Sequence, residues 1–497
     1  MAATRGRVGW SFGTGVAEWR AGPAIVTNTG GHLVRVVLIY LPHPYLQQPD
    51  AQAPLGLMYV GAVLENAGIE VLMRNYSSLL THQAIDELPE ADLYGITVTS
   101  LELPQANRFT HLIKEKYPQA RVCLGGPGTY TDKYVDWHVI DCICRGDGEL
   151  AILDIINDLR RGELKQLYDG RMVQDLDSLP LPARHLLNGS QGGNIFAYNH
   201  NYKPGGSTIL STSRGCPFKC SFCSAPYFTN MSCGMRYRSP KKVYEEIKHV
   251  VETYNVRQFR ISDDMFLARR SRVAELCELI GDLDIVWRIS TRVKPFDKDI
   301  ADMIRQAGCR EVSLGVESFD DQVLKVLNKG NTPEDNAAAL EAAADAGLKT
   351  RVLFMIRTPG QTRHTVPTNI RWLRKVPYDI IACTSFVPIP GSEIWNHPER
   401  YDIEILDRNL DSYNFYFFGK NGENELEDVI KLKDRSLAEL NQETLDFRQF
   451  LKSTGKLNGE DEPKDVIKIT DRSLAELNQE TPDFRQLPKS TGKRKAG

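Results

Sequence analysis

The sequence predicts an α/β protein with an open, doubly wound domain, followed by a partial (β/α)6 barrel and a small helical region. Two observations predict this order: strand and helix patterns alternate from residue 35 to 161, and six more strand–helix repeats lie between 207 and 387. A third is composition, since 41% hydrophobic and 25% charged residues in a 497-residue chain are typical of a globular protein with two or three domains.

Charge and cysteine content narrow the class of protein. The formal net charge of -3 gives no electrostatic reason to expect binding to nucleic acid or to an anionic membrane. No segment approaches the ~20 apolar residues that span a bilayer, and the first residues lack the apolar core of a signal peptide. Ten cysteines are too sparse for a disulfide scaffold, and most of them lie in apolar segments typical of buried thiols. We therefore expect a cytoplasmic protein with no membrane or nucleic-acid partner.

The first domain is expected at 34–165, after a flexible extension at 1–33 that has no clear periodicity. The apolar run 36–40 is typical of a strand buried in a parallel sheet, and the amphipathic pattern at 55–67 predicts a helix. In an open sheet of this kind, ligands bind at the carboxyl ends of the strands. The other predicted strands lie at 69–73, 93–98, 121–124 and 140–144, and the other helices at 105–117 and 149–161.

A linker rich in proline and glycine is expected at 166–205, and the barrel domain at 206–400. Six strand–helix units are fewer than the eight that close a (β/α)8 barrel, so this barrel is expected to be partial, with functional residues at the carboxyl ends of its strands. Its predicted strands lie at 207–213, 258–262, 285–290, 311–316, 351–356 and 380–387, and its helices at 240–254, 269–283, 297–306, 333–346 and 363–375.

A small helical region is expected at 401–456, where leucines and Phe447 form one apolar face. Residues 428–456 recur at 465–493 with 24 of 29 positions identical, which indicates a tandem duplication. In the second copy Pro482 replaces a leucine, and proline within a helix removes a hydrogen bond and clashes with the preceding turn. We therefore expect 457–497 to be a degenerate, disordered tail.

Three cysteines, Cys216, Cys220 and Cys223, are the most informative feature of the barrel domain. Their C-x3-C-x2-C spacing is suited to holding three irons of a [4Fe–4S] cluster, with the fourth iron open to a small molecule. A ferredoxin that only transfers electrons normally supplies four cysteines. A zinc knuckle or chance clustering is the alternative, but a zinc site needs a fourth ligand, and neither Cys233 nor His200 has the usual spacing.

The cysteine run, with the aromatic residue Phe222 before its third cysteine, resembles the signature of the radical S-adenosylmethionine (SAM) enzymes. The resemblance implies that the three cysteines hold a [4Fe–4S] cluster whose open iron binds SAM. It also implies that SAM contacts residues at the ends of the next strands. A carboxylate at the fourth strand is suited to the ribose hydroxyls, because it accepts two hydrogen bonds. A helix cap or a surface ion pair is the alternative for any one carboxylate. The implied SAM residues are Phe222, Asp264, Arg292, Glu317 and Ser318.

The first domain resembles the cobalamin-binding domain found upstream of many radical SAM barrels. The resemblance rests on Pro-Leu-Gly at 54–56, Gly-Ile-Thr at 95–97, the strand-end turn 125–129, and Arg-Gly-Asp-Gly-Glu at 145–149, where the family usually has Glu in place of Asp147. Glycine at a strand end lets the backbone approach a ligand closely, although a tight strand-to-helix turn explains the same glycines. The implied cobalamin contacts are Pro54, Gly56, Thr97, Gly125, Gly126 and Thr129.

No Asp-x-His-x-x-Gly motif supplies an axial histidine for cobalt, and the fused radical SAM enzymes commonly lack it too. We therefore name no residue of this chain as a cobalt ligand. His43 follows the first strand and is placed to approach the cofactor, but a solvated loop histidine is the simpler interpretation.

The end of the fifth barrel strand departs from the family pattern. Relatives usually have Gly-x-Pro-Gly-Glu-Thr there, whereas this chain has Arg357 in place of the first glycine and Gln361 in place of Glu. A guanidinium at this position is suited to a bidentate clamp on a substrate carboxylate or phosphate. A solvated, outward side chain is the alternative.

Residues 34–456 as a whole resemble a radical SAM enzyme with a cobalamin-binding domain, a group that includes class B methyltransferases and the anaerobic magnesium-protoporphyrin ester cyclase. The resemblance implies that SAM is cleaved to a 5′-deoxyadenosyl radical, with electrons from an external donor such as flavodoxin or ferredoxin. The expected outcome is cobalamin-dependent methylation of an unactivated carbon of a small-molecule substrate. Oxidative cyclisation, rearrangement or dehydration is the alternative within this architecture, with cobalamin in another role or absent.

Two other functions were considered, and the sequence supports them less well. An iron–sulfur structural or electron-transfer module would need neither Glu317 nor a partial barrel. A tRNA-modifying enzyme would usually carry a basic RNA-binding module, and none is visible.

Overall fold

The computed structural model describes residues 34–43, 53–169, 172–187, 202–203, 206–225, 234–413 and 429–457. All of these residues belong to one compact unit of the chain. The extension at 1–33, the tail from 458 and parts of the expected linker lie outside the described residues, as do Cys233 and His200.

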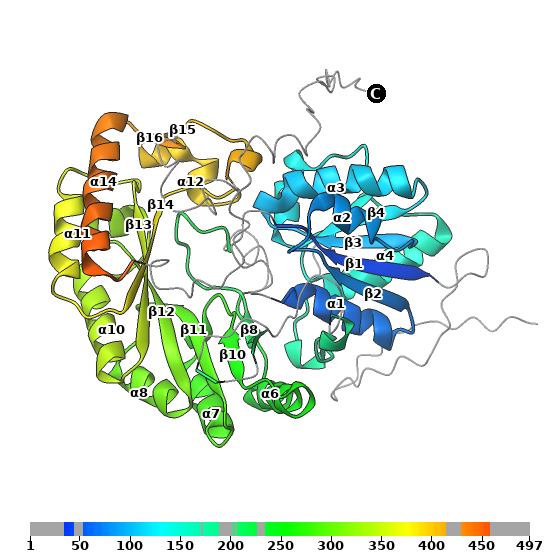
Figure 1. Cartoon of the computed structure of the whole chain (residues 1–497), viewed down its shortest axis with the longest axis horizontal. Coiled ribbons are helices and arrows are strands. Elements are labelled where there is room, and N and C mark those ends of the chain that lie inside the picture. Colours follow the sequence, from blue (N-terminus) through cyan, green and yellow to red (C-terminus); the bar gives the residue numbers. More distant parts are fainter. Residues whose placement is uncertain are drawn as a thin grey trace, which may run out of the picture. The chain divides into compact units, whose positions relative to one another are not determined.

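Apolar strands build a parallel sheet in the first domain (Figure 1). In the described part of the chain its strand order is β2-β1-β3-β4-β5-β6. The order of connection reverses between β1 and β3, and in doubly wound sheets the crevice at such a reversal is where ligands bind. The strands are β1 (Arg35–Tyr40), β2 (Glu70–Asn75), β3 (Leu93–Thr97), β4 (Arg121–Gly125), β5 (Cys142–Cys144) and β6 (Leu167–Tyr168).

Both faces of this sheet are covered, because successive residues of a strand point to opposite faces. In β1, Val36 and Leu38 join one apolar core, and Val37 and Ile39 join the other. Apolar residues of α1 and α4 belong to the first core, and those of α2 and α3 to the second. This arrangement confirms the predicted doubly wound domain. The helices are α1 (Leu55–Asn66), α2 (Thr81–Asp86), α3 (Leu103–Lys116) and α4 (Gly148–Arg161).

The second sheet confirms the predicted partial barrel (Figure 1). Among the described residues, parallel strands follow one another in the order β7-β10-β11-β12-β13-β14, so each new strand is added at the same edge. The strands are β7 (Ser207–Leu210), β10 (Gln258–Ile261), β11 (Val286–Arg292), β12 (Cys309–Glu317), β13 (Lys349–Ile356) and β14 (Ile380–Ser385).

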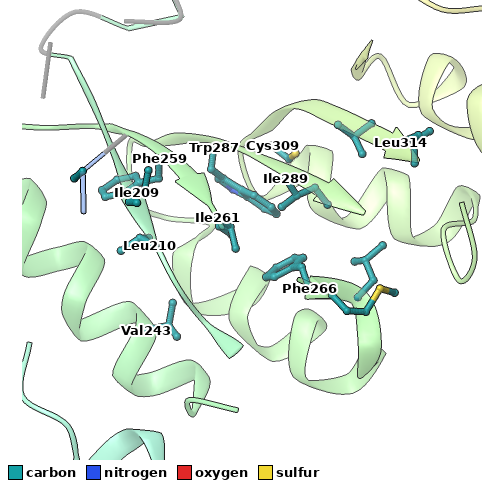
Figure 2. Close-up of a cluster of buried hydrophobic side chains, with 14 of the residues drawn as sticks. Ile209, Leu210, Val243, Phe259, Ile261, Phe266, Trp287, Ile289, Cys309 and Leu314 are labelled. Carbon is teal, nitrogen blue, oxygen red and sulfur yellow. The ribbon is translucent and has the colours of Figure 1, made fainter. Parts of the chain in front are cut away.

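Helices pack on one face of the second sheet and leave the other face for the site. Figure 2 shows part of this packing, where Val243 of α6 lies near the strand residue Leu210, and Phe266 lies near Ile261 and Trp287. The rings of Phe266 and Trp287 meet edge to face at 5.8 Å. Alternate strand residues point away from this core. The helices with residues in this core are α6 (Pro240–Tyr254), α7 (Arg270–Ile280), α8 (Lys298–Gln306), α10 (Pro333–Asp345) and α11 (Thr365–Leu373). The short helices α9 (Asp321–Val326) and α12 (Glu393–Asn396) contribute Val323, Ile394 and Trp395 to the other core.

Several short elements were not predicted from the sequence. Residues 167–168 of the expected linker form β6, which pairs with β5. The first barrel strand ends at Leu210 rather than 213, and the following residues form a separate antiparallel pair, β8 (Ser213–Arg214) with β9 (Arg236–Tyr237). Arg184 of the expected linker is buried and ion-paired with Glu246 of α6. Strands of two residues are too short for periodicity to indicate them.

The C-terminal region combines a pair of strands with one long helix. β15 (Ile403–Ile405) pairs antiparallel with β16 (Ile430–Leu432), and no pattern predicted either strand. The expected helix is α14 (Leu437–Thr454), which begins at a capping box of Ser436 and Glu439. Its buried residues include the predicted apolar positions Leu440, Phe447 and Leu451.

The cysteines outside the motif are free thiols in the described part of the chain, as their apolar contexts indicated. Burial raises the pKa of Cys277 and of Cys383 to about 12, so these thiols are protonated and unreactive at neutral pH. Among the described residues, no helix is both long and apolar enough to cross a membrane. The other cysteines of this set are Cys123, Cys142, Cys144 and Cys309, all buried.

Candidate functional site

The segment between β8 and β9 carries Cys216, Cys220 and Cys223 and is called the cysteine loop below. β8 and β9 pair so that Arg214 lies opposite Arg236, and this pair of strands is called the neck of the loop. Gly215 follows with a φ of 98°, and a Cβ at this position would lie 2.9 Å from the carbonyl oxygen of Gly234. Only glycine allows this approach. The neck therefore fixes where Cys216 enters the loop.

The three predicted cluster ligands lie just beyond this neck. Cys220 is buried, Cys216 and Cys223 are half-buried, and the Cys223 amide donates to the Cys220 carbonyl at 3.1 Å. Burial raises the pKa of Cys216, and raises that of Cys223 to about 11. Both thiols are therefore protonated at neutral pH until a metal displaces the proton.

The described residues contain no group of three or more His, Cys, Asp or Glu side chains placed to hold a single metal ion. In a [4Fe–4S] cluster each thiolate binds a different iron, so three cysteines leave one iron open.

Arg292 brings a positive charge to the cysteine loop from the end of β11. Its Nη1 donates to the Cys220 Sγ at 2.8 Å, and its guanidinium lies 3.9 Å from the centroid of the Phe218 ring. These contacts direct Arg292 to the cysteines rather than to solvent. The structure thus brings together two predicted site residues that are 72 positions apart in sequence.

Glu317 ends β12 in the left-handed region, with a φ of 63°. Its Oε1 accepts a hydrogen bond from the Lys329 Nζ at 2.8 Å, and the two side chains are only 10% and 5% exposed. A Cβ on Gly315 would lie 2.8 Å from both charged atoms, so a side chain at this position would displace the ends of both side chains. The Lys329 Nζ also lies 5.6 Å from the centroid of the Phe222 ring. Lys329 was not predicted, since it lies in a loop without a motif and no local pattern indicates a buried lysine.

Ser318 is tied into the fold. It is buried, its hydroxyl donates to the Asn369 Oδ1 at 3.2 Å, and it accepts from the Asp320 amide at 3.0 Å. These bonds fix the turn after β12. The predicted contact of Ser318 with SAM stays a prediction.

The two aspartates after β10 differ in environment. Asp263 is buried and accepts hydrogen bonds from Thr212 and Ser213, which hold the segment that leads into the cysteine loop. Asp264 reaches solvent, although the surrounding protein raises its pKa by desolvation, partly offset by a hydrogen bond from the Gly215 amide. Of the two, Asp264 is the carboxylate available to a ligand.

The predicted cobalamin residues after β3 and β4 meet at the carboxyl edge of the first sheet. Thr97 pairs with Gly125, and the Val98 amide donates to the Gly125 carbonyl at 2.9 Å. Gly126 has a φ of 88°, and a Cβ there would lie 2.8 Å from the Val98 carbonyl oxygen. The buried Thr129 hydroxyl donates to the Gly126 carbonyl at 2.8 Å. Gly126 and Thr129 are therefore required by the turn itself.

Gly56 and Gly125 differ from Gly126, because a Cβ at either position would have no atom within 4 Å. Gly56 lies in the first turn of α1, next to the buried Pro54. Both glycines therefore leave space that a side chain would fill. Such space at the carboxyl edge of a doubly wound sheet fits the approach of a large ligand, as the resemblance to a cobalamin domain implies.

His43 is not a solvated loop histidine, so that interpretation was wrong. Its side chain is 7% exposed, and its Nε2 lies 3.8 Å from the Oε1 of Glu102, which is also buried. Burial lowers the pKa of His43 to about 4 and raises the pKa of Glu102. His43 is therefore a neutral, buried imidazole at pH 7, at the point where β1 ends.

Arg357 and Gln361, the two residues that depart from the family pattern after β13, are joined by a hydrogen bond. Arg357 has a φ of 59°, so it occupies a backbone conformation that favours glycine, and its side chain is 5% exposed. The alternative that the Arg357 side chain points outward into solvent is therefore wrong. The Arg357 amide donates to the Gln361 Oε1 at 2.7 Å, and the Gln361 Nε2 donates to Glu443 of α14 at 3.0 Å. Gln361 thus joins this turn to the C-terminal helix.

The Arg-Gly-Asp-Gly-Glu motif at 145–149 faces the neck of the cysteine loop. The Asp147 Oδ1 lies 3.0 Å from the Arg214 Nη1, and Asp147 also pairs with Arg236. The Glu149 Oε1 lies 2.6 Å from the Arg214 Nη2. The sequence grouped this motif with the cobalamin residues, and the structure brings its two carboxylates to the cysteine loop.

Comparison with known proteins gives matches for both halves of the chain. A family model described as the B12 binding domain matches residues 51–156, and the Radical SAM superfamily model matches residues 210–373. An uncharacterized methyltransferase of Pyrococcus horikoshii is 28% identical over 369 residues, which are 69% of this chain and 78% of that protein. The anaerobic magnesium-protoporphyrin IX monomethyl ester cyclase of Rubrivivax gelatinosus is 26% identical over 410 residues, which are 73% of this chain and 72% of that protein.

A solved structure agrees in fold with these matches. It is the radical SAM methyltransferase TsrM from Kitasatospora setae with cobalamin and a [4Fe–4S] cluster bound. The TM-score is 0.61 at 16% identity, over 86% of this chain and 92% of that chain. The radical SAM domain implies a [4Fe–4S] cluster and SAM, and the first domain implies cobalamin. The chain is therefore a radical SAM enzyme with an N-terminal cobalamin-binding domain.

Proposed function

We propose that this enzyme is a cobalamin-dependent methyltransferase that acts on an unactivated carbon of a small-molecule substrate. The observation that carries the proposal is the presence, within one compact unit, of a three-cysteine loop and an open carboxyl edge at Gly56 and Gly125. The similarity to a protein named as a methyltransferase supports it.

The bound cofactors supply the difficult chemistry, a carbon-centred radical from the cluster with SAM and a methyl carrier in cobalamin, while the protein positions them. Cys216, Cys220 and Cys223 would each hold one iron, which leaves the fourth iron for SAM. Arg292 donates to the Cys220 Sγ and so keeps a positive charge beside this ligand. An external donor such as flavodoxin or ferredoxin would supply the electron.

Glu317 is suited to bind the ribose of SAM because Lys329 fixes one of its oxygens. Lys329 bonds to Oε1, which leaves Oε2 as an acceptor for a ribose hydroxyl. The left-handed backbone at Glu317 and the missing side chain at Gly315 both serve this placement. Strained backbone of this kind is often found at functional sites.

Arg357 is the candidate for recognition of the substrate. It lies buried at the end of β13, in a backbone conformation that favours glycine. A carboxylate or phosphate on the substrate would be attracted to its guanidinium. Full activity in the Arg357→Ala variant would contradict this assignment.

Oxidative cyclisation is the second candidate function, and the similarity to a magnesium-protoporphyrin ester cyclase favours it. The two reactions consume SAM differently. Methyl transfer through cobalamin produces S-adenosylhomocysteine as well as 5′-deoxyadenosine, because one SAM supplies the methyl group and another the radical. Cyclisation produces 5′-deoxyadenosine alone.

The test is to purify the protein without oxygen, reconstitute the cluster, load hydroxocobalamin, and incubate it with reductant and SAM that carries a deuterated methyl group. We expect both nucleoside products, and a mass gain of one labelled methyl group when a metabolite extract supplies the substrate. Formation of 5′-deoxyadenosine without S-adenosylhomocysteine would favour cyclisation. Failure to retain cobalamin after gel filtration would refute methyl transfer.

A further inference from the structure

We infer that Asp147 and Glu149 are positioning residues that tie both ends of the cysteine loop to the first domain. They thereby fix the three thiols relative to the cobalamin-binding edge. The inference requires a cluster at the cysteine loop but does not require that the reaction be methyl transfer.

The contacts make a buried network of charges at the neck. Asp147 contacts the guanidiniums of both Arg214 and Arg236, and Glu149 contacts Arg214. The Asp147 Oδ2 also accepts from the Val173 amide at 2.7 Å, and the Arg236 Nη1 donates to the Val173 carbonyl at 2.7 Å. Each carboxylate is at most 10% exposed. Pairs of this kind are strongly directional, because a guanidinium presents its donors in a fixed plane.

The network acts on the cluster ligands through a short connection. Arg214 precedes Cys216 by two residues. Gly215 lies between them, and a side chain there would clash with the Gly234 backbone. A shift of Arg214 or Arg236 therefore moves the neck and with it the first thiol. Arg214 has a second anchor, since its guanidinium lies 5.2 Å from the centroid of the Tyr59 ring on α1.

The same motif also contacts the turn assigned to cobalamin. The Arg145 Nε donates to the Thr129 carbonyl at 3.2 Å, and the Thr129 hydroxyl lies 3.2 Å from the Cys144 carbonyl oxygen. Residues 144–149 therefore join the turn at 125–129 on one side to the neck of the cysteine loop on the other.

The test compares the isosteric variants Asp147→Asn and Glu149→Gln with the wild-type holoprotein after cluster reconstitution and hydroxocobalamin loading. Iron content should be retained, because no thiol is changed. The electron paramagnetic resonance (EPR) spectrum of the reduced cluster with SAM should change. The rate of 5′-deoxyadenosine formation should fall on the order of 100-fold in Asp147→Asn, as for misplacement of a reacting group by about 1 Å. Glu149→Gln should show a smaller change, because Glu149 holds only Arg214.

Asp158→Asn is the matched control. Asp158 is a buried carboxylate on the same helix, α4, but it pairs with Arg161 and Lys165 and touches neither end of the cysteine loop. Its EPR spectrum and cleavage rate should stay at wild-type values. Asp147→Glu keeps the charge and should retain most of the rate, whereas an equal loss in Asp147→Glu and Asp147→Asn would contradict a role for the charge.

Wild-type spectra and rates in Asp147→Asn would overturn the inference. If that variant does not fold, Arg236→Lys tests the same contact, since lysine keeps the charge but loses the planar fork. An unchanged SAM-bound spectrum in Arg236→Lys would equally overturn it. A wild-type protein without iron or SAM cleavage would instead refute the cluster at Cys216, Cys220 and Cys223, which separates the two failures.

Discussion

Replacing Lys329 with methionine would remove the cation that pairs with Glu317 while keeping a side chain of similar length. The two charged atoms are 2.8 Å apart, and both side chains are almost fully buried. Coulomb's law with an effective dielectric constant of about 20 gives an attraction of ~6 kcal/mol at this distance. Part of this attraction is offset by the cost of burying the charges. Removal of one partner from a buried ion pair typically destabilises a protein by about 3–5 kcal/mol.

The assay is thermal unfolding of the anaerobic protein, followed by the fluorescence of its tryptophans, together with SAM binding. For a domain of about 200 residues, a loss of about 3–5 kcal/mol lowers Tm by roughly 6–20 °C. The Glu317→Gln and Lys329→Met double variant should be more stable than Lys329→Met alone, because it leaves no buried carboxylate without its cation. SAM affinity should fall in Lys329→Met, since the carboxylate that is proposed to meet the ribose is no longer fixed.

Lys298→Met is the control for this experiment. The Lys298 Nζ lies at the same 2.8 Å from a carboxylate oxygen, that of Asp302, but the pair is on the surface. Exposed pairs contribute little, so Tm should not change measurably. A Lys329→Met protein with the Tm and SAM affinity of the wild type would refute the reasoning that burial makes the Glu317 pair essential.

Three further predictions concern the cluster, the cobalamin edge and pH. Cys220→Ala should lose cluster iron, measured by metal analysis, because one iron then has no protein ligand; full iron content with SAM cleavage would contradict the ligand assignment. Gly125→Val should lower cobalamin retention while leaving the [4Fe–4S] absorbance intact, since its side chain enters open space, whereas Gly126→Val should also destabilise the turn, because its Cβ meets a carbonyl oxygen. His43 has a pKa of about 4 in the folded protein and 6.5 in the unfolded chain, so its protonation favours unfolding and stability falls as the pH drops. Between pH 7 and pH 5 this cost grows by about 2 kcal/mol, and urea unfolding should show that His43→Asn loses less stability than the wild type over this range.

Much of the fold followed from local patterns. Runs such as 36–40 are long enough to show the periodicity of a buried strand, and the structure places strands and helices close to the predicted ranges in both sheets. β8 and β9 were missed because two residues show no period. His43 was misread because burial depends on Glu102 and other residues far away in sequence, which local context does not indicate.

By itself, the sequence determined the order of the two domains and predicted the cluster residues, because hydrophobic periodicity and the spacing of Cys216, Cys220 and Cys223 are properties of neighbouring residues. Only the tertiary structure decided which charges meet. Lys329 reaches Glu317 across 12 positions, and Asp147 reaches Arg236 across 89. Such pairs form where two strand ends or two loops come together, and no spacing along the chain indicates them. These two ion pairs therefore depend on the tertiary fold and not on any local pattern in the sequence.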